Sequence, residues 1–104
     1  MRKVTEETTE AFMDNKNCSK GNTVVKVEDG FVNMYFHGHK IARKNIATGV
    51  VEINNCNYET NVTKERLCGI IDRCSSPNDR IYQQSFVWYW KRGEMFLPNR
   101  WHQL

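Results

Sequence analysis

A chain of 104 residues is long enough for one hydrophobic core, so we expect residues 1–104 to form a single domain. Its hydrophobic fraction of 39% and charged fraction of 26% lie near globular averages, which excludes a wholly disordered chain. The formal net charge of +3 is smaller than a dedicated duplex-DNA-binding domain usually carries. Four of the twelve acidic residues lie in the first fourteen positions, which leaves the rest of the chain more basic.

The first half of the chain predicts a helix followed by an antiparallel meander. The helix covers residues 5–14 with Thr5 as its N-cap, and a segment rich in turn-forming residues follows it. Asp29-Gly30 lies between two alternating segments, which is a strong indication of a hairpin. A second turn is predicted at His37-Gly38-His39. The predicted strands are residues 23–28, 31–36, 40–44 and 50–54.

The second half predicts a helix and then two strands. Thr63 is the expected N-cap of a helix that runs to about Cys74, and apolar residues recur along it at helical spacing. A break at residues 75–79 precedes a long strand over residues 80–90. A short strand follows at residues 95–97, and we expect the tail with Trp101 to dock on the domain.

This order of elements predicts an α+β fold. We expect a mostly antiparallel twisted sheet of about five or six strands, with one or two helices packed on one face. Strands and helices do not alternate, so a parallel, doubly wound sheet is not expected.

The aromatic segment at residues 86–90 is the most informative stretch for function. In a continuous strand, Tyr82, Phe86, Trp88 and Trp90 share one face, while Ile81, Val87 and Tyr89 share the other. One helix layer cannot bury both faces, so we expect at least one row to remain partly accessible as a binding surface. The alternative is that a small domain uses all of these rings in its core.

Bases accompany this segment and form a second group on the third strand. Exposed rings beside bases can stack on nucleobases and hold phosphates. The alternative is that the basic strand is an edge kept soluble by its charge. The candidate contact residues for a partner protein or nucleic acid are Lys40, Arg43, Lys44, Trp88, Trp90, Lys91 and Arg92.

The sequence offers no convincing catalytic or metal site, and we expect a non-enzymatic protein without cofactor. His37 and His39 could ligate a metal from one face of a strand, but Gly38 between them favours a turn. A Cys56–His39 pair has the right chemistry for a nucleophile and base, yet no local motif supports it. No cysteines show C-x2-C spacing. We expect all four to be free thiols: Cys18, Cys56, Cys68 and Cys74.

Three segments together resemble a set of small uncharacterised proteins of tailed phages. They are an HG-x-KIA segment within residues 35–42, a T-N-x-T-K-E-R-L helix start at residues 60–67, and the aromatic strand at residues 87–90. The resemblance implies a phage or prophage origin and a host-cytoplasm setting. It assigns no activity and no functional residue, and this chain departs from the set in its four cysteines and its basic tail.

Two functional hypotheses follow. The first is a phage accessory protein that binds and modulates or inhibits a host protein or complex, possibly a defence system such as a CRISPR effector. The second is a small nucleic-acid-binding protein that uses the bases and rings named above. No segment has the roughly 20 apolar residues that span a bilayer, so we expect no membrane partner. A monomer and a homodimer, paired through an exposed strand edge, are both compatible with the pattern.

Overall fold

The computed structural model describes residues 3–76, 79–91 and 93–104. Within them the chain forms two helices and nine strands. The elements in chain order are α1 (Lys3–Met13), β1 (Cys18–Lys20), β2 (Thr23–Glu28), β3 (Phe31–Phe36), β4 (His39–Asn45), β5 (Val51–Ile53), α2 (Asn61–Cys74), β6 (Tyr82–Gln84), β7 (Val87–Trp90), β8 (Glu94–Met95) and β9 (His102–Gln103).

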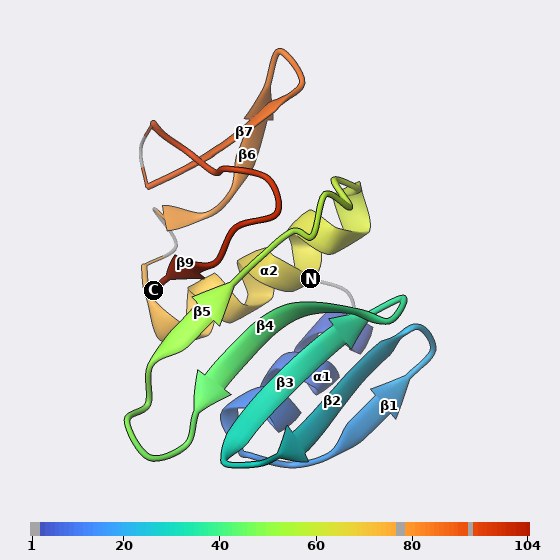
Figure 1. Cartoon of the computed structure of the whole chain (residues 1–104). Coiled ribbons are helices and arrows are strands. Elements are labelled where there is room, and N and C mark those ends of the chain that lie inside the picture. Colours follow the sequence, from blue (N-terminus) through green and yellow to red (C-terminus); the bar gives the residue numbers. More distant parts are fainter. Residues whose placement is uncertain (1–2, 77–78, 92) are drawn as a thin grey trace.

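The strands form two antiparallel sheets. A six-stranded sheet has the order β1-β2-β3-β4-β5-β9, and a three-stranded sheet has the order β6-β7-β8. Both helices lie on one face of the larger sheet, which leaves its other face open (Figure 1). The predicted α+β class with an antiparallel sheet is confirmed. Neither helix, within the described residues, has the length and apolar character needed to cross a membrane.

Two tight turns set the register of the central strands. Asp29 and Gly30 both have positive φ, as do His37 and Gly38, and this geometry matches the right-handed twist of a two-residue hairpin. The β3–β4 register shifts between Met34 and Tyr35, which is a β-bulge. As a result both Ile41 and Ala42 on β4 are buried, although they are adjacent in sequence.

The predicted helix caps are wrong in both cases. The N-cap of α2 is Thr60, whose hydroxyl oxygen accepts a 3.1 Å hydrogen bond from the Thr63 backbone N–H. Thr63 is therefore the third residue inside the helix and is buried. Thr5 also lies inside its helix, where its hydroxyl donates to Glu65 of α2 at 2.8 Å. The Thr60 hydroxyl thus caps α2, and the Thr5 hydroxyl links α1 to α2.

A buried arginine joins α2 to the rest of the fold. The Arg66 Nε donates to the Thr23 hydroxyl on β2 at 3.1 Å, and its Nη1 donates to the Thr5 hydroxyl on α1. The side chain also lies 6.0 Å from the Phe36 ring. Burial of the guanidinium is tolerated because its Nε and Nη1 donate hydrogen bonds and its charge is partly balanced by Glu65 at 3.6 Å.

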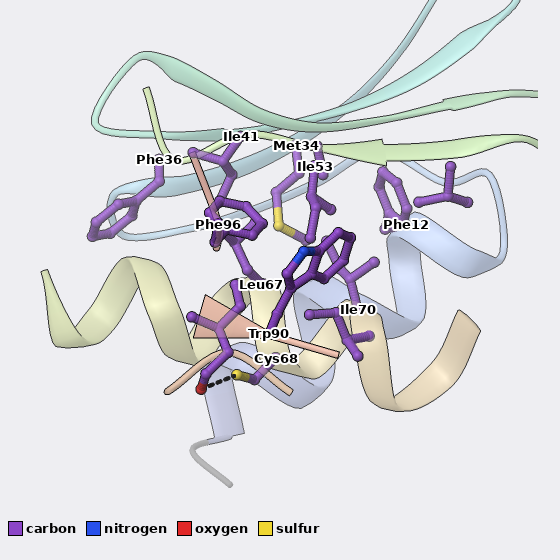
Figure 2. Packing of buried hydrophobic residues seen from close by; sticks show 14 of the residues in the cluster. Phe12, Met34, Phe36, Ile41, Ile53, Leu67, Cys68, Ile70, Trp90 and Phe96 are labelled. Atoms are coloured by element: carbon purple, nitrogen blue, oxygen red, sulfur yellow. Dashed lines mark hydrogen bonds between the residues drawn. The ribbon is translucent and has the colours of Figure 1, made fainter. Parts of the chain in front are cut away.

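The last part of the chain completes the core. Figure 2 shows Trp90 and Phe96 between the inward-facing residues of the sheet and the apolar stripe of α2. The predicted docking of the tail is confirmed: β9 pairs with β5, and the Leu104 N–H donates to Val51 O at 2.9 Å. The fully buried large side chains of the core include Phe12, Met34, Ile41, Ile53, Leu67, Ile70, Ile71 and Phe96.

Candidate interaction surface

The segment predicted as one strand over residues 80–90 is a hairpin. Strands β6 and β7 pair antiparallel through a two-residue turn at Ser85 and Phe86, whose φ angles are 52° and 65°. Type I′ turns usually carry Asn-Gly, because only small residues adopt positive φ without strain. Ser-Phe is not typical of such a turn. The alternating pattern of residues 80–90 therefore predicted one continuous strand, although the chain reverses direction at Ser85 and Phe86. The hairpin extends away from the larger sheet (Figure 1).

One face of this hairpin is part of the core. Trp88 and Trp90 are only 2% and 4% exposed. Phe96 lies with its ring centroid 5.3 Å from that of Trp90, and His102 stacks on Phe96 at 4.1 Å. The two tryptophans predicted as contact residues therefore cannot offer a ring face to a partner. They are core residues, because both tryptophans pack against Phe96 and Trp90 lies between α2 and the sheet (Figure 2).

The opposite face of the hairpin is accessible, uncharged and mostly apolar, with Gln84 as its polar member. Tyr82 pairs with Tyr89 across β6 and β7, and Tyr89 pairs with Met95 on β8. The Tyr82 and Tyr89 rings are stacked, with their centroids 5.8 Å apart. Tyr82 is 41% exposed and Met95 is 52% exposed. This confirms the expectation of one accessible row, with Tyr82 in it rather than beside the tryptophans.

Phe86 stands at the tip of the hairpin and is 89% exposed. A phenylalanine that is almost fully exposed, in a backbone conformation that disfavours its side chain, is unusual in a stable turn. We refer to Phe86 and the row below it as the hairpin surface. Its members are Tyr82, Phe86, Val87, Tyr89 and Met95.

The bases near the hairpin lie at its foot rather than along it. Residues 81–90 include no charged side chain. The Lys91 ammonium lies 4.4 Å from the centroid of the Trp90 ring, so it contacts the face of the hairpin that belongs to the core. Arg80 forms an ion pair with Asp72 at 3.2 Å. The predicted contact residue Arg92 lies outside the described residues.

The second predicted group is divided by the structure. Lys44 is buried: its Nζ donates to the Met13 carbonyl at 2.9 Å and lies over the Phe12 ring, so it is not a contact residue. Arg43 and Lys40 point to the open face of the larger sheet, where Arg43 pairs with Glu52 at 2.9 Å. The predicted residues therefore do not form one surface, because they belong to two separate sheets.

The thiols and imidazoles considered for catalysis have other partners. The Cys56 thiol donates to the Lys40 carbonyl at 3.1 Å, while His39 lies against the Tyr58 ring at 5.5 Å. Burial raises the pKa of the Cys56, Cys68 and Cys74 thiols, which reduces their reactivity. All four cysteines are free. In the described part of the chain, no three His, Cys, Asp or Glu side chains are grouped to hold a metal ion.

Phe86, Tyr82 and Met95 form a joint surface that the local strand pattern did not predict. The ten uncharged residues at 81–90 could have indicated it, because such a run is uncommon in a chain with 26% charged residues. The reversal at Ser85 was needed to see which of these side chains point outward.

The chain matches the model of a known protein family. The model of a family described as Kyanoviridae Gp96 protein matches residues 1–103. No curated protein matches the chain. No solved structure matches it either.

Proposed function

We propose that this chain, which belongs to the Kyanoviridae Gp96 protein family, is a phage accessory protein that binds a host protein and is not an enzyme. The binding site is the hairpin surface, with Phe86 as its central contact. Its target is a host component in the cytoplasm, which the chain modulates or inhibits. A defence system such as a CRISPR effector is one such target.

The exposed tip of the hairpin is the single observation that supports this proposal most. Leaving Phe86 89% exposed forgoes about 1.5–3 kcal/mol of burial free energy. Its positive φ adds a conformational cost of about 1–2 kcal/mol that glycine would avoid. An aromatic side chain kept at two such costs is explained if its burial occurs in a complex.

The chemistry of the hairpin surface favours a protein as its occupant. Its members carry no charge, and residues 81–90 provide no cation that could hold a phosphate. Aromatic side chains and methionine are enriched at the centres of protein interfaces. A rigid ring on a hairpin fits an apolar pocket on a folded partner, where a few buried aromatic residues contribute most of the binding energy.

Capture from a lysate of the bacterial host, followed by a titration, tests this proposal. The wild-type chain should retain one dominant host protein, and Phe86→Ser should lose it. Ile46→Ser is the matched control, because Ile46 is an exposed apolar residue in the β4–β5 connection, away from the hairpin. With the purified partner, Phe86→Ser should raise the Kd on the order of 30-fold, as expected for a hot-spot residue. Equal binding by wild type and Phe86→Ser, or no retained protein, would contradict the proposal.

A further inference from the structure

The open face of the six-stranded sheet has a different chemistry from the hairpin surface. Strand pairing places the outward side chains of β2, β3 and β4 side by side on the face that the helices leave uncovered (Figure 1). Val24 and Asn45 share this face, which we call the open sheet face, with Lys26, Glu28, Phe31, Asn33, Tyr35, Lys40 and Arg43.

Aromatic rings and cations are interleaved on this face. Tyr35 on the central strand β3 lies between two lysines: the Lys26 Nζ from β2 and the Lys40 Nζ from β4 are each 5.9 Å from its ring centroid. Phe31 lies on the same face of the same strand, four residues away. At the far side, Arg43 covers the Trp101 ring at 4.0 Å.

A shallow hollow of about 200 Å³ lies between these groups. It is lined by Glu28, Asp29, Phe31, Asn33, Tyr35, Lys40 and Arg43. Glu28 Oε1 accepts hydrogen bonds from the Tyr35 hydroxyl at 2.8 Å and from the Asn33 amide at 3.3 Å. These bonds lower the pKa of the Glu28 carboxyl and keep it an ionised acceptor. They also hold the ring, amide and carboxylate in one fixed arrangement.

We infer that the open sheet face binds single-stranded nucleic acid, with a base stacked on Tyr35 or Phe31. The lysines beside Tyr35 supply the charge that a phosphate needs. The exposed carboxylate of Glu28, which the buried Asn33 amide holds in place, is a group that accepts from the exocyclic amine of a base. A single strand fits better than a duplex, because a flat sheet reaches bases only when they are unstacked and turned outward.

The carboxylates on this face support the choice of ligand. Three cations share it with Glu28 and with Glu52, which pairs with Arg43, and Asp29 lies at its margin. Phosphate contact alone would favour a face without acids. A face that combines rings, cations and an ordered carboxylate instead fits a nucleotide, in which the base and the phosphate need opposite partners.

Fluorescence anisotropy with a labelled mixed-sequence 12-mer, as DNA and as RNA, tests this inference on the full chain. We expect saturable binding at low salt that weakens by more than 10-fold between 50 and 200 mM salt if about three phosphates are contacted. Tyr35→Leu and Lys40→Glu should each weaken binding by roughly 10-fold or more, since stacking on one ring is worth about 1–3 kcal/mol. Circular dichroism establishes that each variant is folded.

Two controls separate this surface from the hairpin. Lys16→Glu makes the same charge change in the exposed connection between α1 and β1, and it should weaken binding much less than Lys40→Glu. Phe86→Ser should leave oligonucleotide binding unchanged, so this inference can fail while the proposed function stands, and the reverse. Absence of saturable binding at low salt, equal affinity for the matching duplex, or an unchanged affinity in folded Tyr35→Leu would overturn it. So would the finding that this face retains a protein instead of an oligonucleotide.

Discussion

Tyr82 stacks on Tyr89 across the β6–β7 hairpin, with the ring centroids 5.8 Å apart. The two residues face each other in the register, so the same pairing that holds the hairpin together also creates its accessible row. On the other side of the same two strands, Trp88 and Trp90 are in the core. The hairpin is therefore anchored by one face and presents the other, with Phe86 at the tip.

The turn at Ser85 and Phe86 predicts that the fold can be stabilised at the expense of binding. The double change Ser85→Asn with Phe86→Gly replaces two residues at positive φ by the pair that this turn prefers. Because Phe86 is almost fully exposed, its removal costs little packing. We expect a gain of about 1–2 kcal/mol, which raises Tm by several degrees in differential scanning calorimetry. A lower Tm would contradict this explanation of the turn.

The buried tryptophans predict a large asymmetry between the two faces of β7. Trp90→Ala should reduce the free energy of unfolding by about 3–5 kcal/mol, because it leaves a cavity between α2 and the sheet. Tyr89→Ala, on the half-exposed face, should cost clearly less. Urea unfolding measures both, and Trp90→Phe replaces Trp90→Ala if the latter does not fold. A larger loss for Tyr89→Ala would show that the faces are assigned the wrong way round.

The N-cap of α2 gives a prediction at a single hydroxyl. Thr60→Ala removes the acceptor of the Thr63 N–H and should cost about 1 kcal/mol, whereas Thr60→Asn should retain most of the stability. Lys16→Ala serves as a control in the exposed connection between α1 and β1. The measurement is again the urea midpoint at constant m-value. A loss in Thr60→Asn as large as in Thr60→Ala would exclude a capping role.

Acid should destabilise the protein through its surface ion pairs. A hydrogen bond from Lys20 lowers the pKa of the Glu7 carboxyl, and one from Arg73 lowers the pKa of Glu10. The folded chain therefore binds fewer protons than the unfolded chain around the ordinary carboxyl pKa. The stabilisation that these two carboxylates contribute is fully present above that value. It is lost as the pH falls from about 4.5 through the lowered pKa of the folded state.

The variant Glu10→Gln tests this linkage. Its Tm should fall less steeply with acid than that of the wild type, because one of the depressed carboxyls is absent. Glu59→Gln changes an exposed carboxylate of the β5–α2 connection and provides the comparison. Identical acid profiles for Glu10→Gln and the wild type would mean that the Arg73 ion pair contributes nothing.

The parts of the fold that followed from the sequence are those governed by local rules. The Asp29-Gly30 turn and the alternation around it correctly placed β2 and β3, with Val32, Met34 and Phe36 buried. The helix of residues 61–74 was visible from its apolar stripe. These features depend on side-chain period and turn chemistry, which neighbouring residues determine.

The aromatic segment could not be resolved by the same rules. A two-residue turn does not interrupt the alternation of a sequence, but it reverses the chain and changes which residues share a face. Tyr82 is thus grouped with Tyr89 rather than with Trp88. The turn conformation of Phe86 is maintained by the rest of the hairpin against its own preference, and no local pattern reports such a tertiary effect.

The open sheet face and the hairpin surface also depend on non-local pairing. Lys40 and Lys26 meet at Tyr35 only because β2 and β4 flank β3 in register. Arg43 and Lys44 are adjacent and were expected to project to opposite sides of the strand, and the side that carries Lys44 is the one that α1 covers. Which cations remain accessible is decided by the packing of the helices, and a charge count alone does not contain that information.

The most direct measurement of the proposed function uses the Ser85→Asn, Phe86→Gly double variant. The host protein captured by the wild-type chain is purified and titrated with both chains by calorimetry. The variant should be at least as stable as the wild type and should bind the partner with a Kd raised on the order of 30-fold or more. A variant that is equally stable and binds with unchanged affinity would show that the ring at the tip of the hairpin is not the contact.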